Sequence, residues 1–326
     1  MLRGKHSTRS RTAGVGSIVA VTAAAVGLTA SAHADSLIAT DPTATNLSAS
    51  AGTLAWSRRE PSGHHRLVIR RAGVIADAPV APFSVPVDAD LGQSKDGRLV
   101  AVYARCPSQR SCDLFELDVD AGTEHKLGAL SSGSRSEAAA SVFGGRIAFT
   151  RTRQFSTNSL IRHSRDGGLF VGRRRIDRRA VVEIDLSRTW IAFKPYDFES
   201  DAILVRRLSR RGRPRACRLG GGSPLTGSSS GIGLSGPLLA EGFLWWMQES
   251  LPAISDESPR AAGIARRRLP RGGCRYGRIQ YSRTITTSPS PYTRPTMDSF
   301  ALDGTQLYYT AGGVWAVDRS SLGLPD

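Results

Sequence analysis

The chain repeats a short pattern of polar and apolar positions six times. Each copy has a glycine or polar turn followed by a short run of aliphatic and aromatic residues, as in GGRIAFT at 144–150. Stiff and flat side chains of this kind favour the pleated surface of a β-sheet. Aligning the copies on one apolar residue gives intervals of 45, 48, 44, 53 and 63 residues. The aligned residues are Leu54, Leu99, Ile147, Ile191, Leu244 and Leu307.

A second strand-like run follows each copy after a polar loop. Apolar and polar positions alternate in several of these runs, as expected for strands with one buried face. The runs occupy residues 66–71, 113–119, 159–163, 202–208, 263–269 and 313–318. A third strand is expected before each new copy, for example at 82–88, 178–184 and 276–282. Helix patterns and caps are nearly absent, so the chain is predicted to be all-β.

Strand-forming units that recur every 40–50 residues predict the blades of a β-propeller. Six copies predict six blades, and the lengthened fifth copy leaves seven blades open. The last copy has only two clear strands, at 306–310 and 314–318, whereas a lone strand-like run occupies 35–40. We expect this N-terminal strand to complete the last blade, because closing the ring removes exposed sheet edges.

The aromatic residues lie at matching places in the repeats, where packing between blades explains most of them. Trp245 and Trp246 are adjacent in the fifth copy. Because neighbouring residues of a strand point to opposite faces, one of the two is expected to be buried and the other to reach a groove.

The second copy carries a family resemblance. Residues 96–127 combine an Asp-Gly turn, a strand, a polar loop and a second strand that ends in an acidic-glycine hairpin. This order resembles the TolB-like, WD-repeat-like propellers of exported bacterial proteins. The resemblance extends over residues 40–318, although only the second copy matches fully. It implies a secreted or periplasmic binding platform and no specific reaction.

The N-terminal segment has the layout of a secretory signal peptide. Four basic residues precede an uncharged, mostly apolar stretch at 13–30, and Ala32-His33-Ala34 offers a small-x-small cleavage site before Asp35. We therefore expect a signal peptide over 1–34 and a propeller domain over 35–326, secreted, periplasmic or attached to the cell wall. The alternative is that the segment is retained as a membrane anchor.

Four cysteines in an exported chain predict disulfide bonds. Cys106 and Cys112 flank five residues between two strand-like runs, so a hairpin would place their sulfurs opposite each other. Cys217 and Cys274 remain, and their pairing stays open because matching places in neighbouring units need not be close. The chain has no C-x-x-C motif and its histidines are scattered, which argues against a zinc site. We expect no metal and no cofactor.

The chain is strongly basic, with a formal net charge of +16. Half of its arginines lie in three segments, 162–179, 206–218 and 266–278. Each segment begins at the end of a predicted second strand and continues through the next hairpin, so consecutive blades would bring the segments together on one face. The candidate binding residues are Arg173, Arg174, Arg175, Arg207, Arg211, Arg213, Arg266, Arg267 and Arg271.

These arginines suggest a site for an anionic partner. Planar guanidinium groups suit phosphate and carboxylate, so the face would dock an anionic cell-wall polymer, an acidic polysaccharide, an anionic lipid or an envelope protein. A solvated basic rim with no partner is the competing interpretation. Export argues against a specific nucleic acid, and we expect a monomer.

Candidate catalytic groups are weaker. Loop carboxylates between the first and second strands could act as acid and base on a sugar, which leaves an extracytoplasmic hydrolase or lyase as the alternative function. GSSSG at 227–231 and GIGLSG at 231–236 match catalytic and dinucleotide motifs, but neither begins a helix as those sites require. A non-enzymatic binding or scaffold module with no catalytic residue is therefore favoured. The loop carboxylates are Asp197, Glu199, Asp201, Glu249, Asp256 and Glu257.

Overall fold

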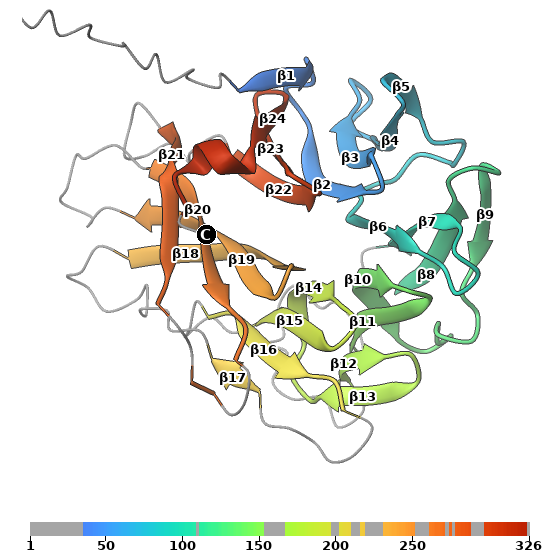
Figure 1. The fold of residues 1–326 in the computed structure, drawn as a ribbon. Helices are drawn as coiled ribbons and strands as arrows, with labels where there is room; N and C mark the ends of the chain where they lie inside the picture. Colours follow the sequence, from blue (N-terminus) through green and yellow to red (C-terminus); the bar gives the residue numbers. More distant parts are fainter. Residues whose placement is uncertain are drawn as a thin grey trace, which may run out of the picture. The chain divides into compact units, whose positions relative to one another are not determined.

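Six antiparallel four-stranded sheets follow one another around a central axis in the computed structural model (Figure 1). This arrangement is a six-bladed β-propeller, and it confirms the predicted fold class. The structure describes residues 35–108, 111–152, 167–196, 202–209, 216–218, 231–251, 261–270, 274–275, 278–287 and 297–324. The predicted signal peptide lies outside these residues and stays a prediction. No helix within the described ranges has the length and apolar character needed to cross a bilayer.

Each blade contains four strands in chain order, except the last blade, which takes one strand from the N-terminus. The first three blades consist of β2 (Thr45–Ser50), β3 (Thr53–Arg59), β4 (His65–Arg71) and β5 (Val74–Asp77); β6 (Ala89–Gln93), β7 (Leu99–Ser108), β8 (Ser111–Asp118) and β9 (Thr123–Lys126); and β10 (Ser136–Phe143), β11 (Arg146–Thr152), β12 (Gly168–Val171) and β13 (Arg174–Asp177).

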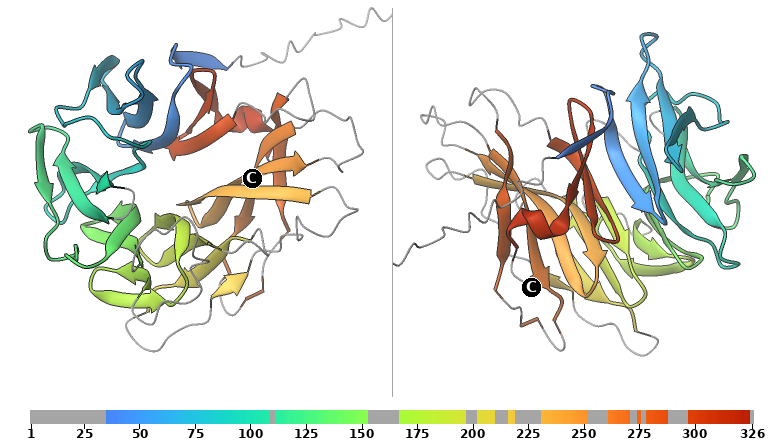
Figure 2. Two further views of the ribbon diagram at one scale, coloured as in Figure 1. Left: turned by 180° about the vertical axis from the view of Figure 1, so that it is seen from behind. Right: turned by 45° about the horizontal axis from the view of Figure 1, so that its top comes forward.

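The remaining blades complete the ring, as both views in Figure 2 show. They consist of β14 (Val181–Leu186), β15 (Trp190–Pro195), β16 (Leu204–Arg207) and β17 (Cys217–Arg218); β18 (Gly231–Ala240), β19 (Phe243–Leu251), β20 (Ala261–Arg268) and β21 (Gln280–Thr287); and β22 (Met297–Asp303), β23 (Gln306–Ala311) and β24 (Val314–Asp318) with β1 (Ser36–Ala39).

The turn and apolar run that recur in the sequence form the second strand of each blade. The innermost strand of the blade lies before this strand in the sequence. Several predicted strands therefore need correction. The run expected as a third strand at 178–184 overlaps β14, which is the innermost strand of the fourth blade, whereas the run at 276–282 overlaps β21, the outermost strand of the fifth blade, as expected. Alternation along a strand reveals its buried face but not the sheet to which it belongs.

One further strand prediction was wrong, and another lies outside the described residues. Residues 82–88 form no strand, and only Phe83 makes an isolated bridge, with His65. The third blade pairs β11 with β12, at Gly168–Val171, whereas the run expected in this role, 159–163, lies outside the described residues.

The register of the second blade also differs from the sequence alignment. Ile147 of the third blade pairs with Val142, the inner-strand residue whose N–H donates to Asp90 of the second blade. The residue of the second blade in the same position is Ala101, two places after the aligned Leu99. The four-residue Ser-Lys-Asp-Gly turn at 94–97 lengthens this hairpin, which shifts the alignment.

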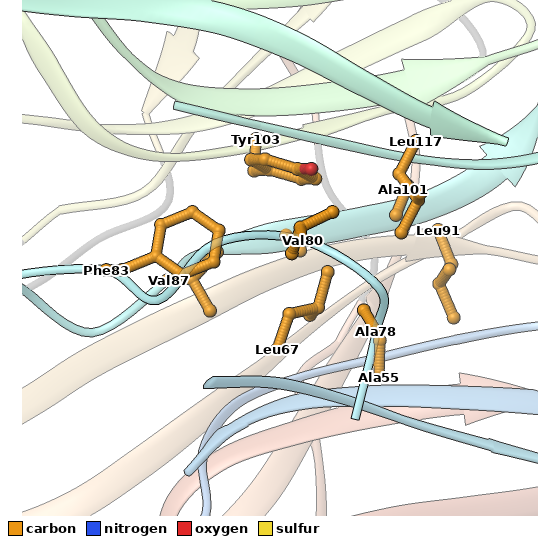
Figure 3. Packing of buried hydrophobic residues seen from close by; sticks show 11 residues of the cluster. Ala55, Leu67, Ala78, Val80, Phe83, Val87, Leu91, Ala101, Tyr103 and Leu117 are labelled. Carbon is orange, nitrogen blue, oxygen red and sulfur yellow. The ribbon is translucent and has the colours of Figure 1, made fainter. Parts of the chain in front are cut away.

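Apolar side chains fill each space between neighbouring blades. Between the first and second blades, residues of β3 and β4 pack against β7 and β8, with Phe83 lying edge-on to Tyr103 at 5.5 Å between ring centroids (Figure 3). Second strands are covered on both faces by adjacent sheets. Trp245 and Trp246 are consequently both buried, facing the sixth and the fourth blade respectively, so the expectation that one of them reaches a groove was wrong.

The N-terminal strand closes the ring as predicted. β1 pairs antiparallel with β24, so the last blade has four strands from both ends of the domain. Just before β1, the Asp35 carboxylate accepts hydrogen bonds from Tyr309 Oη at 2.5 Å and from Arg283 Nη2 at 2.6 Å. These contacts tie the first strand to β23 and β21.

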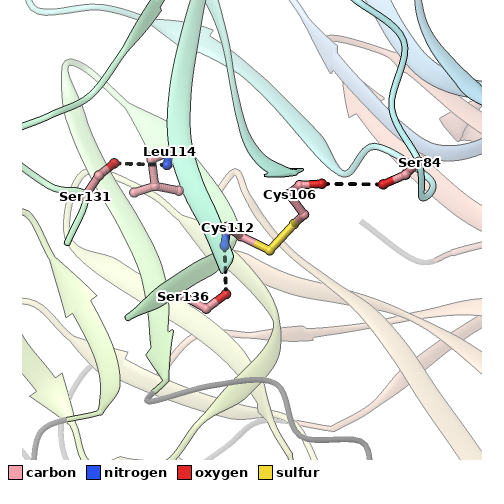
Figure 4. The surroundings of a disulfide bond; sticks show 6 residues. All are labelled: Ser84, Cys106, Cys112, Leu114, Ser131 and Ser136. Carbon is pink, nitrogen blue, oxygen red and sulfur yellow. Dashed lines mark hydrogen bonds between the residues drawn. A yellow bond between two sulfur atoms is a disulfide. The ribbon is translucent and has the colours of Figure 1, made fainter. Parts of the chain in front are cut away.

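Both possible disulfide bonds form. Cys106–Cys112 joins β7 to β8, and the Cys112 N–H donates to Ser136 Oγ in the next blade at 3.1 Å (Figure 4). Cys217–Cys274 joins β17 of the fourth blade to the segment after β20 of the fifth, with 5.2 Å between Cα atoms. The second bridge therefore crosses a junction between blades. Two disulfides are compatible with an extracytoplasmic protein.

The two bridges should differ in their effect on stability. They close loops of 57 and 6 residues, and chain entropy assigns about 4 kcal/mol to the longer loop and about 2 kcal/mol to the shorter. We expect the double variant Cys217→Ser/Cys274→Ser to lower the free energy of unfolding in urea by about twice as much as Cys106→Ser/Cys112→Ser. Equal losses would contradict this expectation.

Candidate functional site

Arginines from the hairpins of the third and fourth blades surround one surface depression of about 510 Å³. The turns β10–β11, β12–β13 and β14–β15 and the end of β16 all lie on the same face of the ring, because alternate strands of each blade run in opposite directions. Val171, Ile176 and Leu208 contribute apolar surface, and no carboxylate is among the lining residues that the structure describes. The six arginines are Arg146, Arg174, Arg175, Arg188, Arg206 and Arg207.

Main-chain carbonyl groups orient several of these guanidinium groups. Arg146 Nη2 donates to the carbonyl oxygens of Ser187 and Arg188, each at 2.8 Å, across the junction between the blades. Arg174 Nη1 donates to the carbonyl of Ser209 at 3.1 Å across the same junction, and Arg206 donates to the carbonyl of Ile176. These carbonyl groups fix the orientation of the side chains, and Arg206 also lies 3.9 Å from the Asp177 carboxylate.

Two arginines at the tip of the fourth blade are exposed. Arg188 lies in the β14–β15 turn and Arg207 at the end of β16. Neither has a carboxylate within 4 Å among the residues that the structure describes. Their guanidinium groups are therefore oriented to attract an anion from solution.

A second depression, of about 640 Å³, lies on the other side of this tip and shares Arg188 and Arg207 with the first. Arg268 of the fifth blade adds a third cation. The Glu241 carboxylate also lies here, and Arg319 binds it at 2.7 and 2.5 Å. The other lining residues are mostly apolar: Phe143, Trp190, Leu239, Ala240, Leu269 and Pro270.

The structure brings together only some of the predicted arginines. Arg174, Arg175 and Arg207 line the first depression, and Arg173 is exposed in the adjacent β12–β13 turn. Arg267 is half-buried on β20 and lines neither depression. The predicted residues Arg211, Arg213 and Arg271 lie outside the described part of the chain.

Arg266 occupies a different environment from the one expected. Only 7% of its surface is exposed, and its guanidinium group lies 4.6 Å from the Phe243 ring centroid and 5.0 Å from that of Trp245. Its Nε donates to Gln280 at 2.6 Å. This arginine packs the fifth blade and presents no charge at the surface, because alternation along β20 turns it inward.

Sequence reasoning missed four of the lining arginines. Arg146 and Arg188 are single residues next to hairpin turns, far from any arginine-rich segment, and only the ring places them beside the others. Arg206 and Arg268 belong to the recognised segments but were not selected. A search for basic residues next to every first hairpin of a repeat would have found Arg146 and Arg188.

The inner strands line an axial channel of about 530 Å³ that is acidic. No basic side chain lines it within the described residues. Asp88 immediately precedes β6, which contains Asp90, and Glu183 and Asp185 are two residues apart on β14, where they point to one face of the strand. Asp298 of β22 also lines the channel. The channel lining reaches the second depression at Phe143, Leu239 and Ala240.

Several of these carboxylates hydrogen-bond to the main chain of the next blade. Asp90 Oδ2 accepts the Val142 N–H at 2.7 Å, and Asp185 Oδ2 accepts the Leu239 N–H at 2.5 Å. Glu183 likewise accepts the Gly236 N–H at 2.7 Å. Three of the channel carboxylates are therefore held in place by the hydrogen bonds that join neighbouring blades. Asp88 has no hydrogen-bond partner among the described residues.

Burial changes the acidity of the channel. It raises the pKa of Asp88 to about 7, with smaller contributions from the charges of Asp90 and Glu183. The Asp88 side chain is itself exposed to the solvent of the channel, so its desolvation comes from the surrounding channel walls and not from loss of contact with solvent. Burial also raises the pKa of Asp90 to about 6, against the opposing hydrogen bonds from Val142, Ser141 and Ser48. The pKa of Asp185 is raised well above its ordinary value by burial and then by the charge of Asp90.

The carboxylates selected from the sequence are not those of the channel. Glu249 lies on β19, and the loop residues Asp197, Glu199, Asp201, Asp256 and Glu257 lie outside the described residues. Among the residues that are described, no group of three or more His, Cys, Asp and Glu could hold a metal ion. The channel acids were missed because the innermost strand of each blade was not recognised.

Comparison with known proteins supports the fold and does not assign a family. No family model matches the chain, and no curated protein matches it. The propeller is similar to a crystal structure of puromycin hydrolase, with a TM-score of 0.50 and 15% identity, over 88% of this chain and 54% of that one. A mutant of the same enzyme complexed with PGG gives a TM-score of 0.52 at 15% identity, over 87% and 53%. The chain thus spans about half the length of these proteins, and such identities show the fold alone.

The buried carboxylates should make stability depend on pH. A carboxyl group whose pKa is raised on folding stabilises the protein fully below its unfolded pKa, and this contribution is lost as the pH rises through the folded pKa. We expect the free energy of unfolding to fall between about pH 4 and pH 7, with Asp90 contributing up to about 3 kcal/mol. Asp90→Asn should flatten this slope in urea titrations at a series of pH values.

A matched variant gives the control for this experiment. The Arg98 and Ser94 side chains lower the pKa of Asp96 to about 2, so this group titrates below the tested range. Asp96→Asn should therefore leave the slope between pH 5 and pH 7 unchanged. If wild type and Asp90→Asn showed the same slope of unfolding free energy against pH, the channel carboxylates would not control the pH dependence of stability.

Proposed function

We propose that the protein is an exported, non-enzymatic binding module that docks an anionic polymer of the cell envelope on the hairpin face of its third to fifth blades. One observation carries this proposal: among the described residues, six arginines and no carboxylate line one depression. Guanidinium groups bind carboxylates and phosphates through charge-assisted hydrogen bonds, and the exposed Arg188 and Arg207 are available for such contacts. The proposal retains the kinship with TolB-like propellers implied by residues 96–127.

The internal contacts of other arginines support this assignment by contrast. Arg105 lies 4.3 Å from the Phe83 ring centroid and pairs with Glu124 at 2.6 Å, and Arg151 lies 4.9 Å from the Phe170 ring centroid. Such arginines serve the packing of their own blades. Arg188 and Arg207 have no comparable contact among the described residues, so a ligand accounts best for their exposure beside four other cations.

Charge reversal tests the proposal. We expect Arg188→Glu and Arg207→Glu each to weaken binding to a purified wall polymer by at least about tenfold, because a charge-assisted contact worth about 1.5–3 kcal/mol becomes a repulsion. Binding to the wild type should fall steeply with salt, as counterion release requires. Retention on immobilised polymer across a salt series measures both effects.

Arg59→Glu is the matched control for these variants. Arg59 is exposed at the end of β3, on the opposite face of the ring, and its reversal changes the net charge by the same amount. This variant should bind as the wild type does. Equal losses for all three variants would mean that net charge, and not the hairpin face, governs binding.

A hydrolase or lyase acting on carbohydrate is the second candidate, and Asp88 supports it. A carboxyl group with a pKa of about 7 in a channel can donate a proton near neutral pH, as a general acid must. On this hypothesis, Asp88→Asn abolishes turnover of an acidic polysaccharide while binding at the arginine depressions is retained. Absence of turnover by the wild type, assayed by the release of new reducing ends, would exclude this candidate for the polymer tested.

A further inference from the structure

The second depression combines arginines with an apolar floor that includes aromatic side chains. The described residues that line the first depression include apolar side chains but no aromatic one. Trp190 and Phe143 line it beside Arg188, Arg207 and Arg268. Phe143 is 42% exposed although it is a large apolar side chain. A site for inorganic anions or phosphate groups alone gains nothing from this aromatic surface, because such ligands have no apolar face to bury.

Strand pairing sets Trp190 next to one of the exposed cations. Trp190 of β15 lies directly opposite Arg207 of β16, so both side chains stand on the same face of the sheet. That face is directed toward the fifth blade, since Trp190 packs at the edge of the cluster containing Leu244 and Trp246. The indole therefore lies between the apolar junction and the guanidinium groups at the tip of the fourth blade.

This pairing matches the chemistry of an acidic sugar. A pyranose ring has one face of C–H groups that stacks on a flat aromatic ring, and a uronic acid carries a carboxylate on the same ring. Arginine binds a carboxylate through two parallel N–H donors. One uronic acid unit can thus satisfy an aromatic and a guanidinium group at once.

We propose that the second depression binds an acidic polysaccharide of carboxylated sugars, with a sugar ring over Trp190 and carboxylates on Arg207, Arg188 and Arg268. The inference rests on the proposed function and specifies its ligand class. The polymer continues over the tip of the fourth blade into the first depression, because Arg188 and Arg207 line both.

Two anionic polymers, one with sugar rings and one without, separate this inference from simple charge attraction. Alginate is a chain of uronic acids, and polyphosphate is an anionic chain without sugar rings. We expect Trp190→Leu to weaken alginate binding about tenfold and to leave polyphosphate binding unchanged, whereas Arg207→Glu weakens both. Trp315→Leu makes the same change in the sixth blade, where the Trp315 indole donates to the carbonyl of Ala311, and should affect neither polymer.

A wild-type measurement covers the case in which Trp190→Leu fails to fold. Stacking is insensitive to salt, so alginate should retain measurable binding in 1 M NaCl while polyphosphate does not. Equal salt sensitivity of the two polymers, or equal losses for both in folded Trp190→Leu, would overturn the inference and leave the proposed function standing. Failure of the wild type to bind either polymer at low salt would overturn both.

Discussion

Side-chain oxygens that accept main-chain N–H groups from the next blade hold the inner ring together. Within the described residues, neighbouring sheets share no β-ladder, so N–H groups of the inner strands that face a neighbouring blade need other partners. Ser48, Asp90, Ser141 and Asp185 occupy the same position in four consecutive blades and supply these partners. The donors are the N–H groups of Leu91, Val142, Leu186 and Leu239. Ser299 bonds to the Leu47 N–H where the last blade meets the first.

This ring of contacts determines the surface as well as the core. It fixes the angle between blades, and the angle brings the hairpin tips of the third and fourth blades close enough for Arg146 and Arg174 to reach carbonyl groups across the junction. The same contacts concentrate carboxylates in the axial channel, where burial raises their pKa. The protein thus has acidic groups at its axis and basic groups on one rim.

The role of each arginine depends on the residues around it, and the number of arginines in the chain does not reveal that role. Arg105, Arg151 and Arg266 lie over aromatic rings and stabilise individual blades, whereas Arg188 and Arg207 protrude at the tip of the fourth blade. A basic composition alone does not separate these classes. The propeller is a scaffold that supports many unrelated activities, so the chemistry of the face carries the functional argument.

The sequence by itself determined the all-β class, the six blades, ring closure by the N-terminal strand and the Cys106–Cys112 hairpin, because these depend on local periodicity and chain order. It placed Arg174, Arg175 and Arg207 in segments that share one face. Only the tertiary structure decided that Arg266 is buried, that Arg146 and Arg188 join the basic depression, that Cys217 reaches Cys274, and that Asp88, Asp90, Glu183 and Asp185 meet at the axis. Apart from the burial of Arg266 within its own blade, these features depend on contacts between different blades, such as those joining residues 41, 52 and 57 positions apart. No pattern within one repeat encodes the distance or angle between two sheets.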